Sequence, residues 1–153
     1  GKQIKDAELT VLDLNDFEMP IYSADREAQS GVPELANQFI NKITNADGII
    51  TSFAEHNGSY SVAFKNILDW VSRANQKAWA GQKLFLMATS PGARGGSFVL
   101  NTASTSFSHF DAEVISTFSL PSFYDNFSVE DGIKDKVLSA TLLKSLSEFT
   151  KAL

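Results

Sequence analysis

The fold is decided by residues 49–73, IITSFAEHNGSYSVAFKNILDWVSR. The first six residues, Ile49–Ala54, are mostly apolar and do not alternate with polar residues, which is typical of a strand buried on both faces. A glycine-bearing loop, Glu55–Ser59, follows this strand. From Ser61 to Arg73 the apolar residues recur at helical spacing over a wide arc, which predicts a helix buried on more than one side. The segment is therefore one strand–loop–helix unit.

The same order of elements occurs again from residue 83. Residues Lys83–Ser90 form a second continuous apolar run, and the glycine-rich stretch Ser90–Gly96 follows it. A weaker helix is expected over Ser97–Phe107, on propensity more than on periodicity. Strands that alternate with helices in this way predict a parallel sheet covered by helices on both faces.

The flanking segments complete an α/β fold. Strands are expected at Leu9–Leu14 and Glu113–Phe118, and both carry polar residues, so we expect them at the periphery of the sheet. An amphipathic helix is predicted over Val32–Ile43, and a closing helix over Ile133–Leu153. No linker or internal repeat interrupts the series, so residues 1–153 are predicted to form a single domain.

The composition argues against several classes of function. The 153 residues include no Cys and 2 His, which rules out disulfides, thiolate metal sites and cysteine nucleophiles and makes a His-rich metal site implausible. The net charge is -5, whereas a nucleic-acid binder is usually basic. The longest apolar runs are far shorter than the roughly 18 residues of a membrane span. We therefore expect no nucleic-acid or membrane partner, and chemistry that comes mostly from a cofactor.

The two glycine-bearing loops are the candidate binding site. In an open parallel sheet the ligand lies outside the carboxyl ends of the strands, where both loops are expected. Backbone amides beside a helix N-terminus suit a polar ring edge or an anion. Each loop taken alone is also what an ordinary tight turn looks like. Two adjacent loops favour a planar, polar-edged ligand, and the absence of the G-x-G-x-x-G and G-x-x-x-x-G-K-[ST] patterns argues against the usual dinucleotide and triphosphate sites. A flavin fits this description.

Three segments resemble the NAD(P)H-dependent FMN reductases of the flavodoxin-like superfamily, which include quinone, chromate and azo-dye reductases. Residues 54–73 are similar to the family's P-E-Y-N-G-S pattern and the helix L-K-N-A-I-D-W-L-S-R that follows it. Residues 90–96 resemble its second glycine loop, and residues 12–22 its D-L-x-D-x-x-x-P-x-Y segment. The resemblance implies a flavodoxin-like three-layer sandwich with strand order 2-1-3-4-5.

The resemblance also implies an activity. We expect an FMN-dependent oxidoreductase that transfers hydride from NADPH or NADH, through the bound flavin, to a small-molecule acceptor such as free flavin or a quinone. No side chain is expected to be catalytic, because the flavin carries the chemistry. The family further implies a cytoplasmic enzyme and a homodimer or homotetramer that pairs through the Ser61–Arg73 helix. The wide apolar arc of that helix, with Trp70 on it, is expected to be the exposed association surface.

The resemblance assigns the cofactor-binding residues to the two loops. They are expected to border the two edges of the flavin ring: Glu55, His56, Asn57 and Gly58 on one side, and Ser90, Gly92, Arg94 and Gly95 on the other. Ala54 and His56 stand where the family usually has Pro and Tyr, so His56 is expected to contact the ring by stacking or by a hydrogen bond. Glu55 is expected to cap or orient its loop rather than to transfer protons. For Arg94, attraction of a phosphate and simple solvation both stay open.

The front of the family pattern is not found in this sequence. The family begins with a strand, a G-S-x-R-x-x-S-x-N loop that holds the FMN phosphate, and a helix. In the order 2-1-3-4-5 that first strand is central, and its loss would leave buried backbone groups unpaired. We therefore predict that the sequence is an N-terminally incomplete record of a protein longer by roughly 25 to 35 residues.

Two alternative functions stay open. A flavodoxin-like electron carrier would share the fold but needs no nicotinamide pocket and typically has a strongly acidic docking face. A flavin-free interaction module is suggested by the absent phosphate loop and predicts a colourless protein. Steady NADPH consumption by the FMN-loaded protein would separate the reductase from both.

Overall fold

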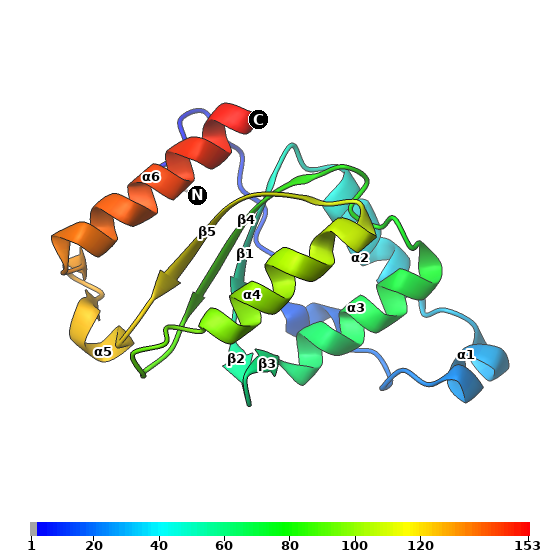
Figure 1. Cartoon of the computed structure of the whole chain (residues 1–153). Helices are drawn as coiled ribbons and strands as arrows, with labels where there is room; N and C mark the ends of the chain where they lie inside the picture. Colours follow the sequence, from blue (N-terminus) through cyan, green and yellow to red (C-terminus); the bar gives the residue numbers. More distant parts are fainter. Residues whose placement is uncertain (1–2) are drawn as a thin grey trace.

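A three-stranded parallel sheet lies at the centre of the computed structural model, which describes residues 3–153 (Figure 1). Its strands β1 (Ile49–Phe53), β4 (Lys83–Thr89) and β5 (Glu113–Leu120) are ordered β1-β4-β5. The strand β4 is in the middle and is the most buried, as its continuous apolar run predicts. The order is that of the last three strands in the predicted topology, and the peripheral position predicted for Glu113–Phe118 is confirmed.

Helices cover both faces of this sheet, which confirms the predicted α/β class (Figure 1). Successive residues of β4 point to opposite faces. Leu84 and Leu86 contact the cluster formed with α2 (Glu34–Thr44), α3 (Val62–Ala74) and α4 (Ser97–Ser106). Phe85 packs on the other face against Phe149 of α6 (Lys136–Ala152), with ring centroids 6.1 Å apart. Two hydrophobic cores therefore hold the sheet between two helical layers.

The predicted helices begin close to their expected residues because local capping defines them. Ser61 is the N-cap of α3 and accepts the Phe64 amide at 3.3 Å, and Asp135 accepts two amides at the start of α6. Pro33 is the N-cap residue of α2 rather than part of its first turn. Within residues 3–153, no helix is both long and apolar enough to cross a bilayer.

Four short helical elements were not predicted from the sequence. They are η1 (Leu14–Phe17), α1 (Ala24–Ser30), η2 (Phe107–Phe110) and α5 (Phe123–Asn126). The helix α1 buries none of its residues, so its sequence has no apolar period to detect. Its ends are nevertheless marked, by the Ser23 cap and by Gly31 at the C-terminus.

The strand predicted at Leu9–Leu14 is wrong. Residues 7–13 form no regular element, and the chain then enters the 3-10 helix η1 (Leu14–Phe17). A strand needs a neighbouring strand for its backbone hydrogen bonds, and no segment of residues 3–153 pairs with this one. Val11 is 89% exposed, whereas Leu12 and Leu14 are partly buried against the core, so only part of the apolar character of the segment is used there.

The apolar arc of α3 is not an exposed surface. Trp70 is only 1% exposed because η1 and the segment Met19–Tyr22 pack across the helix. The indole Nε1 of Trp70 donates to the Pro20 carbonyl at 2.7 Å, and the Tyr22 ring meets the indole edge-on at 5.0 Å. The burial predicted on more than one side of the helix is confirmed, but the helix is covered by other segments of the same chain and not by a second copy.

Candidate functional site

A tight hairpin follows β1 at the carboxyl edge of the sheet. It consists of β2 (Glu55–His56) and β3 (Ser59–Tyr60), joined by Asn57 and Gly58. These two residues have φ of +52° and +74°. A two-residue turn with both φ positive is of type I′, for which Asn-Gly is the preferred sequence. The turn therefore projects His56, Asn57 and Gly58 into solvent.

The glycine loop after β4 has a floor, Gly95 and Gly96, that is packed against the sheet, and a top, Gly92 to Arg94, that is exposed. A Cβ at Gly95 would lie 2.3 Å from Ser119 Oγ, and one at Gly96 would lie 2.7 Å from the Ala88 Cβ. Only glycine permits this close approach of the loop to β4 and β5. Nothing lies within 4 Å of the corresponding position at Gly92, and Arg94 is exposed.

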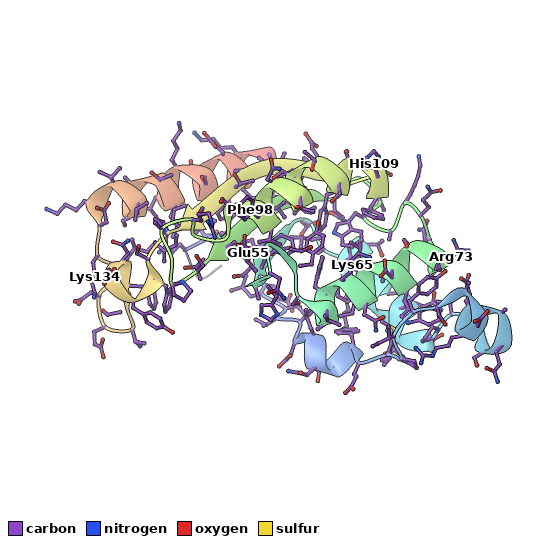
Figure 2. The ribbon with its side chains drawn as sticks, turned by 60° about the horizontal axis from the view of Figure 1, so that its bottom comes forward. Glu55, Lys65, Arg73, Phe98, His109 and Lys134 are labelled. Atoms are coloured by element: carbon purple, nitrogen blue, oxygen red, sulfur yellow. The ribbon has the colours of Figure 1, made fainter. Side chains whose placement is uncertain are left out.

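The hairpin and the glycine loop are neighbours. Glu55 Oε2 accepts a hydrogen bond from the Val99 amide at 3.0 Å, in the first turn of α4. The Phe98 ring lies on the same side, where its Cδ2 is 3.7 Å from the Cβ position of Gly58. Figure 2 shows Glu55 and Phe98 next to one another, with His109 and Arg73 well away from them. The predicted adjacency of the two loops is confirmed, and we call this surface the rim.

A third segment completes the rim behind the glycine loop. The amides of Ser122 and Phe123 donate to the carbonyls of Gly92 and Ser90, each at 3.0 Å. The helix α5 begins there and carries Tyr124, which is 75% exposed. Three consecutive loops of the sheet therefore meet at one edge, as parallel strands require.

The structure brings all eight predicted residues to this edge, but two of them serve the loop itself. Gly95 is buried against Ser119, whose hydroxyl donates to the Gly95 carbonyl at 2.9 Å. The Ser90 hydroxyl donates to the Gly92 carbonyl at 3.2 Å. The other six lie on the hairpin or on the top of the glycine loop: Glu55, His56, Asn57, Gly58, Gly92 and Arg94.

Phe98 is a rim residue that the sequence did not single out. Its ring is 50% exposed, and the Arg94 guanidinium lies over it, 5.2 Å from the ring centroid. Such a cation–π contact fixes an otherwise mobile cation. The available signal was an aromatic residue in the first turn of a helix whose buried side is carried by Val99, Leu100 and Ala103.

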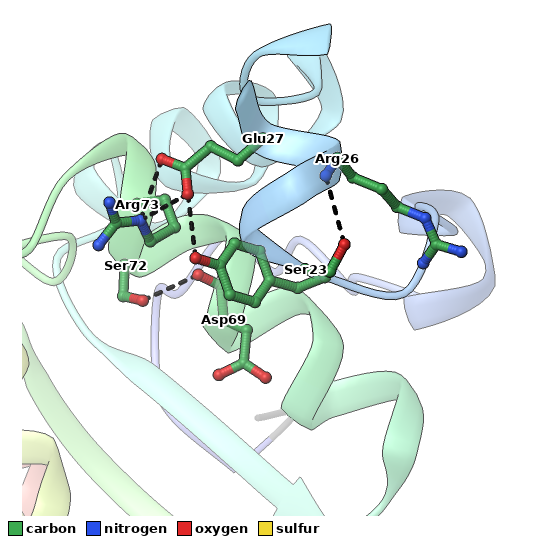
Figure 3. A network of polar contacts seen from close by, with 7 residues as sticks. Ser23, Arg26, Glu27, Asp69, Ser72 and Arg73 are labelled. Atoms are coloured by element: carbon green, nitrogen blue, oxygen red, sulfur yellow. Dashed lines mark hydrogen bonds and ion pairs between the residues drawn. The ribbon is translucent and has the colours of Figure 1, made fainter. Parts of the chain in front are cut away.

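The other two family-like segments, residues 12–22 and the helix α3, contact one another beside the polar network that Figure 3 shows. Residues Met19–Tyr22, here called the strap, are fastened to α3. Asn66 accepts the Tyr22 amide at 2.8 Å and donates to the Met19 carbonyl at 2.9 Å. Glu27 accepts from the Tyr22 hydroxyl at 3.0 Å and from Arg73 Nε at 2.9 Å, an arrangement that Figure 3 shows for Glu27 and Arg73.

The same carboxylate perturbs the strap tyrosine. The hydrogen bond to Glu27 raises the pKa of Tyr22 above its ordinary value, and desolvation adds to the effect. Two cavities, of about 270 and 350 Å³, flank the strap, and their walls include Trp70 and Asn66 respectively. Both lie against α3, so neither belongs to the rim. Among residues 3–153, no three His, Asp or Glu side chains are grouped as metal ligands.

Comparison with known proteins identifies relatives of one kind. The chain is 40% identical over 78 residues to a 2-hydroxy-1,4-benzoquinone reductase of Burkholderia sp, a match of 50% of this chain and 42% of that protein. It is 32% identical over 79 residues to a quinone reductase of Escherichia coli K12, a match of 52% and 42%. The matched segment thus spans only about two fifths of these curated relatives.

A solved structure shares the fold. It is the flavoenzyme NAD(P)H:(acceptor) oxidoreductase FerB of Paracoccus denitrificans, with a TM-score of 0.70 at 23% identity, over 94% of this chain and 79% of that one. This likeness agrees with the predicted flavodoxin-like architecture. The sequence profile of the NADPH-dependent FMN reductases matches residues 1–125, and the chain belongs to that family.

Proposed function

We propose that the chain forms the flavin-ring site of an FMN-dependent oxidoreductase, which takes electrons from NADPH or NADH and delivers them to a small quinone-like acceptor. Family membership and the names of the relatives support this activity. The observation that carries it is the contact between Glu55 and the Val99 amide, which holds the hairpin against the glycine loop at the carboxyl edge of the sheet.

The polar groups of the rim suit the edge of a flavin ring. Within residues 3–153, the backbone amides of Asn57, Gly58, Ala93 and Arg94 donate to no acceptor of the protein, and all four residues are exposed. A flavin ring presents carbonyl oxygens and ring nitrogens that accept such hydrogen bonds. The Glu55 carboxylate already faces the start of α4, so an anionic phosphate at that helix end would be repelled. The rim therefore favours the ring over the phosphate of the cofactor.

Each rim residue has a defined task in this proposal. Bound FMN would supply the redox chemistry, since it accepts hydride from a reduced nicotinamide and passes electrons on. The exposed amides stabilise negative charge on the ring edge. Glu55 orients the hairpin, because its carboxylate accepts the Val99 amide. His56 is exposed and available to contact the ring face, and Arg94, held over Phe98, would contact the phosphate of the nicotinamide nucleotide.

The family resemblance supports three further expectations. The enzyme resides in the cytoplasm, and two or four copies associate; the apolar arc of α3 is covered by the chain itself and does not supply the interface. The outer edge of β1 has no strand neighbour among residues 3–153, so a further strand is expected to pair there. Sedimentation at micromolar concentration tests the association, since a monomer contradicts it.

The proposed activity is tested on the purified full chain. FMN binding is followed by quenching of flavin fluorescence, and NADPH oxidation is then recorded with a benzoquinone as acceptor. Binding together with steady turnover is expected. Binding without turnover would instead indicate an electron carrier, and a protein that binds no FMN would contradict the proposal.

The two histidines provide a matched pair for locating the ring. His56 lies on the hairpin and His109 on η2, and both are exposed. His56→Ala is expected to weaken FMN binding by roughly 3- to 10-fold, the worth of one stacking or hydrogen-bonding contact. His109→Ala is expected to leave the affinity unchanged. Equal effects of the two substitutions would place the ring elsewhere.

A further inference from the structure

The helix α4 begins without a side-chain cap of its own. Its N-cap residue is Gly96, at φ +77°, and no side chain at that position accepts an amide. Ser, Thr, Asp or Asn usually stands there, because its oxygen accepts an amide of the first turn. A Cβ at Gly96 would lie 2.7 Å from the Ala88 Cβ. The packing of the loop on β4 thus excludes every residue that could cap the helix locally.

Glu55 supplies the missing cap from another element. Its Oε2 accepts the amide of Val99, the third residue of α4, at 3.0 Å. The sheet register explains how it arrives there. Phe53 is paired with Ala88, the residue on which Gly96 packs, so the chain leaving β1 passes directly beside the start of α4. The Glu55 carboxylate also faces the positive end of the helix dipole.

This contact joins the two halves of the rim at its open end. On the hairpin, Glu55 immediately precedes the exposed residues of the turn, and its register partner is Tyr60. The Tyr60 hydroxyl is 3.1 Å from Ser106 Oγ, at the far end of α4. The hairpin is therefore tied to both ends of this helix, and Glu55 is the tie next to the glycine loop.

We propose that Glu55 is a positioning residue: as the cap of α4, it sets the spacing between the Asn57-Gly58 turn and the glycine loop. It acts through the Val99 amide and touches no reacting atom. The consequence for ring binding rests on the proposed function, whereas the cap itself does not. The two parts are therefore measured separately.

The cap is tested in the FMN-free protein by amide hydrogen exchange. Glu55→Ala is expected to speed exchange of the Val99 amide by about tenfold, the worth of one helix cap. Glu55→Gln keeps an oxygen at the same reach and should retain most of the protection. Glu55→Asp keeps the charge but is shorter, so the Val99 amide should lose less protection than in Glu55→Ala, while the fold stays intact. Unchanged exchange in both the Ala and the Asp variants would overturn the proposal.

The spacing is tested by FMN affinity in the same variants. Glu55→Ala is expected to weaken binding by about tenfold, and Glu55→Gln to stay close to the original protein. Glu113→Ala is the control, because Glu113 is an exposed carboxylate at the opposite end of the sheet. Loss of Val99 protection with unchanged FMN affinity would overturn the positioning role. If the original protein binds no FMN, the proposed function fails, and the exchange data alone decide whether Glu55 is the cap.

Discussion

The rim and the strap both resemble family sequence patterns, yet they are built in opposite ways. The strap is held by side chains of α3, where Asn66 and Trp70 donate hydrogen bonds to the carbonyls of Met19 and Pro20. At the rim, the Asn57-Gly58 turn and the top of the glycine loop are exposed, and several of their amides have no acceptor within residues 3–153.

The difference separates residues that hold the fold from residues that are available to a ligand. A buried side chain with all its hydrogen bonds made has nothing left for another molecule. Exposed amides held on a rigid support can bind one at little cost in conformational entropy. We therefore assign stability to the strap and recognition to the rim, and the following substitutions test that division.

The largest effect is expected for Trp70→Ala, on the face of α3 that the strap covers. The indole is 1% exposed, donates to the Pro20 carbonyl and packs edge-on against Tyr22. Its removal should lower the free energy of unfolding by about 3–5 kcal/mol, measured by urea denaturation. Phe98→Ala at the rim is the matched control and should cost far less, because half of that ring is already exposed. A larger loss of unfolding free energy for Phe98→Ala than for Trp70→Ala would contradict the assignment of stability to the strap and recognition to the rim.

A second comparison lies within the rim, between its floor and its top. Gly96→Ala combines a left-handed backbone with a Cβ placed 2.7 Å from Ala88, so we expect a loss of roughly 2–4 kcal/mol in unfolding free energy. Gly92→Ala has open space around it and should change stability by less than about 0.5 kcal/mol. Similar losses at both glycines would show that the loop is not packed as described.

The sequence predicted the central elements of the fold and the position of the two loops. The strand β4 and the helix α3 were predictable, because β4 is apolar on both faces and α3 has a long apolar period. The strand β1 was placed correctly, but it is only partly buried because its outer edge has no neighbour among residues 3–153. The helix α4 was expected from propensity alone. The adjacency of the loops also followed from parallel topology. The strand predicted at Leu9–Leu14 failed because the strand propensity of a segment does not reveal whether a partner strand is present.

Contacts between residues far apart in the sequence could not be predicted from local sequence patterns. The hydrogen bond from Val99 to Glu55 spans 44 positions, and the burial of Trp70 depends on a strap some 50 residues earlier in the chain. A helical arc looks the same whether another copy or the chain itself covers it. The expected capping or orienting role of Glu55 was nevertheless in agreement with the observed contact.

The hydrogen bond of Tyr22 in the strap makes the stability of the protein depend on pH. The bond to Glu27 raises the pKa of Tyr22 in the folded protein, so its stabilising effect is present below the unfolded value of about 10 and is lost as the pH rises through the folded value. Tyr22→Phe should remove this part of the alkaline loss of stability. Unfolding free energies of both proteins between neutral and alkaline pH provide the measurement. Parallel curves for the two proteins would contradict the assignment.

Glu27→Gln checks the cause of that shift. With the carboxylate replaced by a neutral amide, the absorbance titration of Tyr22 should move down toward the ordinary tyrosine range. Tyr60 serves as an internal reference, because burial is the main reason that its pKa is raised. A movement of both tyrosines together would indicate a general loosening of the fold rather than loss of one hydrogen bond.

The smallest effect is expected on α3 itself, outside the strap. Lys65 Nζ lies 2.6 Å from Asp69 Oδ1, but their side chains are 54% and 34% exposed. An exposed pair four residues apart is worth about 0.3–0.5 kcal/mol, so Asp69→Asn should change the unfolding free energy by no more than that. Urea denaturation at low and at about 1 M salt should show the difference vanishing as the charges are screened. A large loss at low salt that disappears at about 1 M salt would mean that α3 depends on its surface charges, and that the strap is not what stabilises this helix.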